Sequence, residues 1–321
     1  MAAPSALEVA QMRGAILTWY RHGHRDLPWR GTRGPYAVLV SEVMLQQTQA
    51  SRVAARYPAF MARFPDVTAL ASASEAEVLA EWSGLGYNRR AISLHRAARA
   101  IVKAGWPAEL EGLRRLPGVG QYTARAIGSL AFGWRVGAVD TNVRRWLVRR
   151  FDLEADGAGG APAVQRLADT LASLGDESSR DEAATWTHAS MELGAVVCHA
   201  GQPNCDACPV ATGCPARGAA RRVPVPRQSL FRGSSRAYRG ALLRALASSP
   251  DHSIARGDTP TALADAAPTG ALGDSVDARL VRRAIEDLAR EGLAHVDGNR
   301  LRLGPGTGSE GHPSRRLQSP G

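Results

Sequence analysis

The spacing of apolar residues predicts helices through most of the chain. Residues 5–22 have helical periodicity, and Ser5 is placed to cap the first turn. The apolar positions that define this helix are Leu7, Ala10, Ile16, Leu17 and Tyr20. A second helix is predicted over 37–57, and shorter helices between Gly/Pro turns follow up to residue 225. No run in this region alternates with period two, so we predict that it is all-α.

The last third of the sequence has a different pattern. Amphipathic helices are predicted at about 235–248 and 277–291, and the runs LAHV and RLRL then flank the turn Asp297-Gly298-Asn299. Helices followed by a two-stranded hairpin look like a small winged-helix-like α+β domain. We therefore expect four parts. They are a helical region over 1–225, a basic linker over 217–234, the winged-helix-like domain over 235–304 and a disordered tail over 305–321.

Charge is unevenly distributed over the 321 residues. Lys and Arg total 40 against 30 Asp and Glu, and the stretch 85–150 alone holds 13 basic and 3 acidic residues. The stretch 209–250 holds eight arginines and no acid. Such focused charge favours a polyanionic partner, and the alternative is solubility combined with a general arginine bias. No apolar run is long enough for a membrane span and no signal peptide is evident, so we expect a cytoplasmic protein.

The four cysteines lie together near the end of the helical region. Cys198, Cys205, Cys208 and Cys214 are separated by six, two and five residues. A disulfide framework would spread its cysteines, so this spacing predicts a metal site in a reducing compartment. Zinc and an iron–sulfur cluster both remain open, and the single CxxC with unequal flanks favours iron–sulfur.

A glycine-rich turn lies inside the basic stretch. The segment 116–124, LPGVGQYTA, places Gly118 and Gly120 between two helical patterns. Backbone N–H groups at such a turn can approach a phosphate at the positive end of a helix. We interpret the segment as a helix–hairpin–helix. The alternative is a plain turn with glycines for left-handed dihedrals.

Two isolated acids are candidates for catalysis. Glu42 lies in the apolar segment 38–48, where desolvation would raise its pKa and keep a proton available near neutral pH. Asp140 is the only acid between Leu113 and Arg150 and follows an apolar run. The alternatives are a solvent-facing glutamate on an amphipathic helix and an aspartate that only caps a helix.

Taken together, these motifs resemble the helix–hairpin–helix DNA glycosylases with an iron–sulfur loop, and most closely the adenine DNA glycosylase family. The resemblance runs from Arg25 to Cys214 through RDLPWR, PY, SEVMLQQTQ, GLGYNRRA, LPGVGQYTA, VDTNVRR and ELGAVVC. It implies a six-helix barrel subdomain at about 33–146, packed on a 4Fe–4S helical subdomain formed by 1–32 and 147–216. It also implies base excision repair, in which adenine mispaired with 8-oxoguanine or guanine is removed from double-stranded DNA.

The resemblance implies a role for individual residues. Glu42 would protonate N7 of a flipped adenine, and Asp140 would stabilise the oxocarbenium-like sugar, with Tyr122 and Asn142 beside the reacting nucleotide. The adenine pocket would be formed by Arg25, Leu27, Trp29, Arg30 and Glu192. The duplex would be met by Gln47, Thr48, Leu85 and Tyr87 and by the hairpin residues Gly118, Gly120 and Gln121. The four ligands of a 4Fe–4S cluster would be Cys198, Cys205, Cys208 and Cys214.

Lysine usage separates mechanisms within this superfamily. Relatives that resemble endonuclease III form a Schiff base from a lysine at the position of Tyr122, and the only lysine here is Lys103. We therefore expect a monofunctional glycosylase that uses water, with a transient covalent link to Asp140 left open. Residues 235–304 do not resemble the Nudix-like domain of many relatives. Loop 199–204 also lacks the basic residues that relatives often carry there.

Two other functions compete with adenine excision. One is a thymine-mismatch or oxidised-pyrimidine glycosylase of the same fold, and the other is a non-catalytic iron–sulfur regulator that binds DNA. A pure DNA-binding protein has no use for two buried acids, which argues against the regulator. We expect a protein that acts as a monomer on DNA.

Overall fold

The computed structural model describes residues 6–154, 160–174, 179–218 and 230–306. It divides into two compact units. The first comprises Met1–Ala62 and Arg96–Arg227, and the second comprises Arg63–His95 and Gln228–Gly321. Each is described on its own, and the predicted boundaries of subdomains, linker and tail remain predictions.

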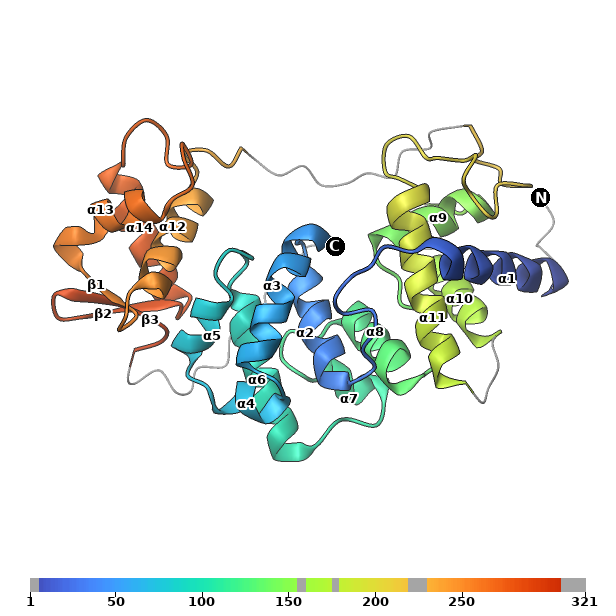
Figure 1. Ribbon diagram of the computed structural model, residues 1–321, viewed down its shortest axis with the longest axis horizontal. Helices are drawn as coiled ribbons and strands as arrows, with labels where there is room; N and C mark the ends of the chain where they lie inside the picture. The colour runs from blue at the N-terminus through green and yellow to red at the C-terminus, as the bar shows by residue number, and fades with distance from the viewer. Residues whose placement is uncertain (1–5, 155–159, 175–178, 219–229, 307–321) are drawn as a thin grey trace. The chain divides into compact units, whose positions relative to one another are not determined.

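The first unit is helical (Figure 1). Its elements are α1 (Ala6–Gly23), α2 (Pro35–Leu45), most of α3 (Ala50–Arg63), the end of α6 (Arg89–Ala104), α7 (Leu110–Arg114), α8 (Gln121–Phe132), α9 (Thr141–Phe151), α10 (Gly160–Ser173), α11 (Arg180–Glu192) and the π-helical turn η1 (Leu193–Val197). Helix α2 packs on α8, which also packs on α7 and α11. Because α2 is apolar on almost every side, it is nearly fully buried, as expected of a central helix.

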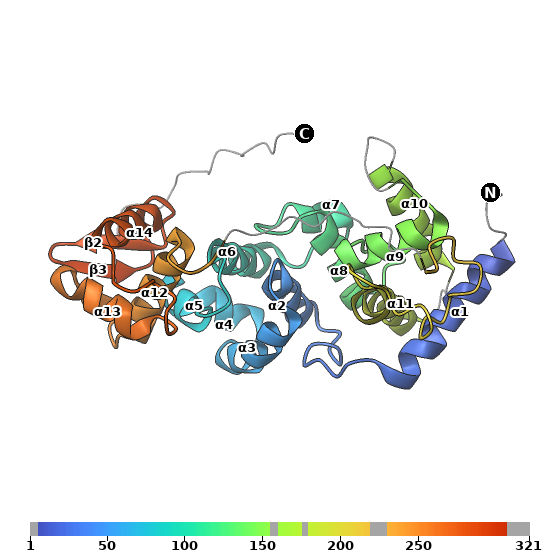
Figure 2. The same cartoon turned by 90° about the horizontal axis from the view of Figure 1, so that it is seen from above.

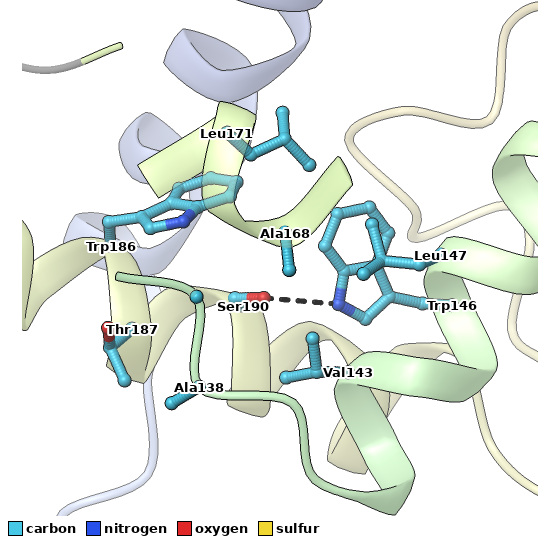
Figure 3. A pocket seen from close by; sticks show the side chains of 10 residues that line it. Ala138, Val143, Trp146, Leu147, Ala168, Leu171, Trp186, Thr187 and Ser190 are labelled. Carbon is cyan, nitrogen blue, oxygen red and sulfur yellow. Dashed lines mark hydrogen bonds between the residues drawn. The ribbon is translucent and has the colours of Figure 1, made fainter. Parts of the chain in front are cut away.

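A second core joins the N-terminal helix to the later helices of this unit. Apolar side chains of α1 pack with those of α9, α10 and α11, including Ile16, Leu147 and Leu171. Figure 3 shows part of this core, where Trp146 Nε1 donates to Ser190 Oγ at 3.2 Å. The cavity there is about 10 Å³, roughly the space of one water, so it is a packing gap and not a ligand site.

The second unit joins two short helices to the C-terminal domain. Its elements are α4 (Val67–Ser72), α5 (Glu75–Glu81), the start of α6, α12 (Ser235–Ser248), β1 (Ser253–Ala255), η2 (Arg256–Asp258), α13 (Thr259–Ala266), α14 (Ala278–Arg290), β2 (Ala294–Asp297) and β3 (Arg300–Leu303). The antiparallel sheet has the order β1-β3-β2, with Val296 opposite Leu301. Helix α12 packs on α13, α14 and α5 (Figure 2). The element order and the hairpin are those of a winged helix, as the sequence predicts.

The all-α prediction is confirmed for the described residues up to 218, but the single helix predicted over 37–57 is wrong. The chain breaks between α2 and α3, where Gln47 has a left-handed φ of 54°. Gln46 Nε2 donates there to Gly118 O at 3.3 Å and to Thr123 Oγ1 at 3.2 Å, which ties the end of α2 to the hairpin. The predicted three-residue turn is also too long. Asp297 pairs with Arg300 in the ladder, so only Gly298 and Asn299 form the turn.

Some predictions fall outside the described residues. They are the Ser5 cap, the linker residues 219–229 and the tail residues 307–321. Among the helices of the described part of the chain, none is both long and apolar enough to span a bilayer.

Candidate active site

Glu42 is held inside the first unit by the buried helix α2. Glu42 is 4 % exposed, and its Oε2 atom has no hydrogen-bond partner among the described residues. Burial raises the pKa of Glu42 to about 7; a hydrogen bond with the Tyr122 side chain lowers it in part, and the charge of Asp140 raises it. Near neutral pH this carboxyl therefore carries a proton in a large fraction of molecules and can act as a general acid.

Asp140 caps α9 and is held by hydrogen bonds. Its Oδ1 accepts from Val143 N at 2.7 Å, and its Oδ2 accepts from Asn142 Nδ2 at 2.8 Å. Burial raises the pKa of Asp140, while the hydrogen bonds from Val143 and Asn142 and the charge of Arg145 lower it. The capping role and a chemical role therefore coexist, because the same donors that fix the carboxylate also favour its charged form.

Tyr122 interacts electrostatically with both acids. It is half-buried in the first turn of α8, and burial together with the charges of Glu42 and Asp140 raises the pKa of its phenol far above the usual range. The structure thus brings Glu42, Tyr122, Asp140 and Asn142 together, as the sequence predicts. Two carboxyls in one site with different surroundings can divide acid and counter-ion roles.

A buried arginine links Asn142 to the cysteine loop. Arg145 donates to Asn142 Oδ1 at 2.8 Å, to Gly194 O at 2.6 Å and to Cys198 O at 2.7 Å. Gly194 belongs to η1, and a Cβ atom there would overlap the backbone of Asn142, so only glycine fits. Asp140, Asn142, Arg145 and Cys198 therefore form one continuous hydrogen-bonded chain.

A third buried carboxylate, Glu192, ends α11. Arg25 donates to both of its oxygens, at 2.8 and 2.7 Å, and Arg30 donates at 2.5 Å. Burial alone would raise the pKa of Glu192, but these hydrogen bonds outweigh it and lower the pKa to about 2. Burial and the charges of Arg30 and Arg33 lower the pKa of nearby His188 to about 3, which keeps its ring neutral.

The other two residues of the predicted adenine pocket lie in the same N-terminal segment. Leu27 is half-buried, and its carbonyl accepts from Arg30 N at 2.9 Å. Trp29 is buried and packs edge-on against Tyr57, with ring centroids 5.9 Å apart. All five predicted pocket residues therefore belong to the first unit, and three of them, Arg25, Arg30 and Glu192, are in direct contact.

The turn before α8 contains two glycines in different surroundings. The backbone conformation of Gly118 favours glycine, whereas the space around Gly120 is empty. Gly118 has a φ of 78°, which favours glycine, while Gly120 is extended and a Cβ atom there would meet nothing within 4 Å. The space over Gly120 leaves the N-terminal N–H groups of α8 accessible to an anion. Gln121 and Tyr122 line a cleft of about 650 Å³ whose other wall carries Arg144 and Arg166.

The predicted duplex contacts differ in exposure. Gln47 is exposed and strained, and Thr48 is half-buried. Tyr87 is 45 % exposed with a φ of 47°, and Arg90 lies over its ring at 5.5 Å. Strained, exposed side chains are typical of functional loops. Leu85, in contrast, is 2 % exposed, so the prediction that its side chain meets DNA is not supported by this structure.

The four cysteines line one cavity of about 30 Å³. Arg149 donates to Cys198 Sγ at 3.4 Å and to His199 O at 2.6 Å, which fixes the start of the loop on α9. Burial raises the pKa of the Cys208 thiol, and the charges of the other cysteines raise it further. Within the described residues, no three His, Cys, Asp or Glu side chains are grouped closely enough to hold a single metal ion.

Sequence reasoning missed the arginines of α9. Arg145 and Arg149 lie four residues apart on one buried helix face and hold the cysteine loop. Their spacing after Asp140 is visible in the sequence, but arginine at helical spacing is usually solvent-facing. Arg144 and Arg166 were missed for another reason, since their cleft forms only when α10 packs beside α9.

This fold and this site define a base excision DNA repair protein. A family model described as "HhH-GPD superfamily base excision DNA repair protein" matches residues 40–161. The chain is 42 % identical over 280 residues to the adenine DNA glycosylase of Mycobacterium tuberculosis (strain ATCC 25618 / H37Rv), covering 83 % of this chain and 90 % of that protein. It is 43 % identical over 222 residues to the adenine DNA glycosylase of Homo sapiens, covering 65 % and 40 % respectively. The chain belongs to the adenine DNA glycosylase family.

Solved structures agree on the fold. A thermostable thymine-DNA glycosylase matches with a TM-score of 0.58 and 27 % identity, over 67 % of this chain and 99 % of that one. A trapped endonuclease III–DNA covalent intermediate matches with a TM-score of 0.56 and 20 % identity, over 68 % and 100 %. The second likeness concerns the fold alone.

Proposed function

We propose that this DNA glycosylase excises adenine mispaired with 8-oxoguanine or guanine from double-stranded DNA. One observation carries the proposal. The Glu42 carboxyl is buried, keeps one oxygen without a partner in the described structure, and is electrostatically coupled to Asp140. An unpartnered buried carboxyl oxygen costs stability unless a ligand uses it.

The two acids divide the chemistry. Adenine is first turned out of the duplex, since the reacting bond is not accessible in the stack. Protonated Glu42 gives its proton to N7, the C1′–N9 bond breaks, and the bonding electrons leave with the base. Asp140 stabilises the positive sugar, water supplies the oxygen that C1′ gains, and the Glu42 carboxylate takes up the proton that this water loses. A transient bond between Asp140 and C1′ before attack by water remains compatible with this arrangement.

Hydrolysis without strand cleavage is part of the proposal. Tyr122 occupies the hairpin position from which lyase-type relatives would present an amine, and its hydroxyl serves Glu42 instead. The single lysine of the chain, Lys103, is exposed near the end of α6. Arginine does not lose its proton at working pH and so cannot form a Schiff base.

The residues that are proposed to receive the base are Arg25, Leu27, Trp29, Arg30 and Glu192. Glu192 stays ionised because two arginines bind it, so it cannot replace Glu42 as the acid. Each Glu192 oxygen already accepts two hydrogen bonds from Arg25 and Arg30, so an amino group of the ligand would replace one of these donors. Adenine carries such a group and thymine does not.

DNA is proposed to run across the hairpin and the arginine cleft. The empty space at Gly120 exposes backbone N–H donors at the start of α8. Arg144 and Arg166 add positive charge in the cleft that Tyr122 also lines. Gln47 and Thr48 of the first unit are proposed to contact the duplex, and the exposed Tyr87 of the second unit is proposed as a further DNA contact. Affinity should then fall steeply with salt, because arginine–phosphate contacts release counterions.

The cysteine loop is proposed to hold a 4Fe–4S cluster. Four thiols around one cavity, with Arg149 against Cys198 Sγ, fit a thiolate-bound group, and the single CxxC with unequal flanks favours a cluster over one zinc ion. When bound, the cluster would supply four cross-links that hold residues 198–214 together. Iron and sulfide in equal amounts, about four of each per chain, is the expected assay result.

A panel of duplexes tests the function. Each duplex carries adenine opposite 8-oxoguanine, adenine opposite guanine, thymine opposite guanine or an oxidised pyrimidine, and breaks are revealed with alkali. We expect breaks at adenine in the first two duplexes and none before alkali. The competing thymine activity is favoured by the likeness to a thymine-DNA glycosylase. Preferred cleavage at thymine would replace our proposal with that one, and binding without any cleavage would favour the regulator.

A further inference from the structure

Helix α14 has a buried apolar face and an exposed face that is rich in arginine. Val281, Ala284 and Leu288 face the domain core and are buried. The exposed residues of α14 are Ala278, Arg279, Arg282, Arg283, Glu286, Ala289 and Arg290. Four arginines and one glutamate are therefore exposed on α14, whose place in the C-terminal domain is seen in Figure 2.

Acidic neighbours offset only some of these arginines. Asp287 lies 4.0 Å from Arg283 and 2.9 Å from Arg290. No ion pair involves Arg279 or Arg282 within residues 230–306 or the rest of the described chain. These two guanidinium groups are exposed and lie one turn apart, so their charge is available to a partner.

The hairpin of the same domain is electrostatically different. Arg300 pairs with Asp251 at 3.1 Å, and Arg302 pairs with Asp297 at 2.9 Å. The positive charge of the β2–β3 hairpin is therefore largely satisfied within the protein. Two arginines without an ion pair in the described part of the chain therefore share one exposed face of α14, whereas Arg256 stands alone on η2 of the same domain.

We propose that the outward face of α14 binds double-stranded DNA through Arg279 and Arg282. A helix of 13 residues is about 20 Å long and fits the major groove, which is about 12 Å wide. In helix-turn-helix domains, the second of the two consecutive helices enters that groove. Helix α14 holds this position after α13. The proposed ligands are the phosphates on either side of the groove, which arginine contacts in any sequence.

This surface is additional to the excision site. Glu42, Tyr122 and Asp140 belong to the first unit, and α14 belongs to the second. Binding through α14 requires no damaged base and no extruded nucleotide. The winged-helix domain would thus hold undamaged DNA independently of sequence, which is useful for an enzyme that searches for rare lesions.

The test measures binding of the full chain to an undamaged 30-base-pair duplex over a range of salt concentrations by fluorescence anisotropy. Each phosphate contact contributes about 0.9 to the slope of log affinity against log salt. We expect R279Q/R282Q to make this slope shallower by about 2 and R279K/R282K to restore it. R256Q is the matched control, since Arg256 is exposed on η2 of the same domain, and it should leave the slope unchanged.

An R279Q/R282Q slope equal to that of the original protein, with an unchanged melting temperature, would overturn the proposal. A slope change of about 1 in R256Q, which is the same size for each charge removed, would overturn it as well, because it would reflect net charge alone. If R279Q/R282Q does not fold, an unchanged slope in the single variant R282Q has the same force. Undamaged DNA contains no excisable base, so these outcomes do not depend on the proposed excision activity.

Discussion

Replacing Glu42 by Gln should remove the activity and stabilise the protein at alkaline pH. The pKa of this carboxyl is raised from 4.5 to about 7, chiefly by burial. One pKa unit corresponds to about 1.4 kcal/mol, so the shift corresponds to about 3 kcal/mol. The folded state holds the proton more tightly than the unfolded state, so this stabilisation is complete below pH 4.5 and is lost as pH rises to about 7.

Above pH 7 the wild-type protein therefore buries a charged carboxylate, whereas the glutamine variant does not. We expect Glu42→Gln to be more stable than wild type by about 3 kcal/mol at pH 8.5 and by far less at pH 4.5. At 2–4 °C per kcal/mol, the melting temperature at pH 8.5 should rise by about 6–12 °C. Differential scanning fluorimetry at both pH values measures this, with Glu109→Gln as an exposed control.

Equal stability of Glu42→Gln and wild type at both pH values would refute the reasoning. It would show that the carboxyl is solvated in solution and is not a proton donor near neutral pH. A gain that is the same at pH 4.5 and pH 8.5 would also refute it, since packing would then be the cause.

Three further substitutions test the surroundings of the acids. Tyr122→Phe removes the hydrogen bond that lowers the Glu42 pKa, so the alkaline limb of the single-turnover pH profile should move to higher pH; a shift to lower pH would contradict this. Arg145→Met leaves buried carbonyl oxygens of Gly194 and Cys198 without donors. It should therefore lower the free energy of unfolding, measured in urea, by about 3 kcal/mol or more. A loss under about 1 kcal/mol would count against a structural role of the hydrogen bonds of Arg145. Gly194→Ala should abolish excision by displacing Asn142, while Gly201→Ala, where a Cβ atom meets nothing, should keep it.

Much of the fold could be predicted from local pattern. The helix at 235–248 matches α12, because Ser234 caps it and its apolar side chains repeat at helical spacing. The break between α2 and α3 could not be predicted, because residues 46–49 contain no glycine or proline. The strained φ of Gln47 is maintained by long-range hydrogen bonds from Gln46 to Gly118 and Thr123, at the turn before α8 and in α8 itself. The sequence does not reveal these bonds.

The functional site, like the fold, could be predicted only in part from local sequence pattern. Local pattern left Glu42 open between a buried acid and a solvent-facing glutamate, and the structure buries it. The position of Asp140 before a helical pattern offered the capping bond that it makes. The contact of both acids with Tyr122 depends on α2 packing against α8, which no local pattern specifies. Leu85 shows the limit of resemblance, since a motif match places a residue in a loop without giving its exposure.

Single-turnover excision by wild type, Glu42→Gln and Asp140→Asn tests whether the two acids carry the reaction. Each protein is mixed in excess with a duplex that carries adenine opposite 8-oxoguanine, and alkali reveals lost adenine. Asn at position 140 keeps a capping oxygen for Val143 N but carries no charge. The account predicts breaks with wild type and none with either variant, although both still bind the duplex. Excision at the wild-type rate by either variant would contradict it.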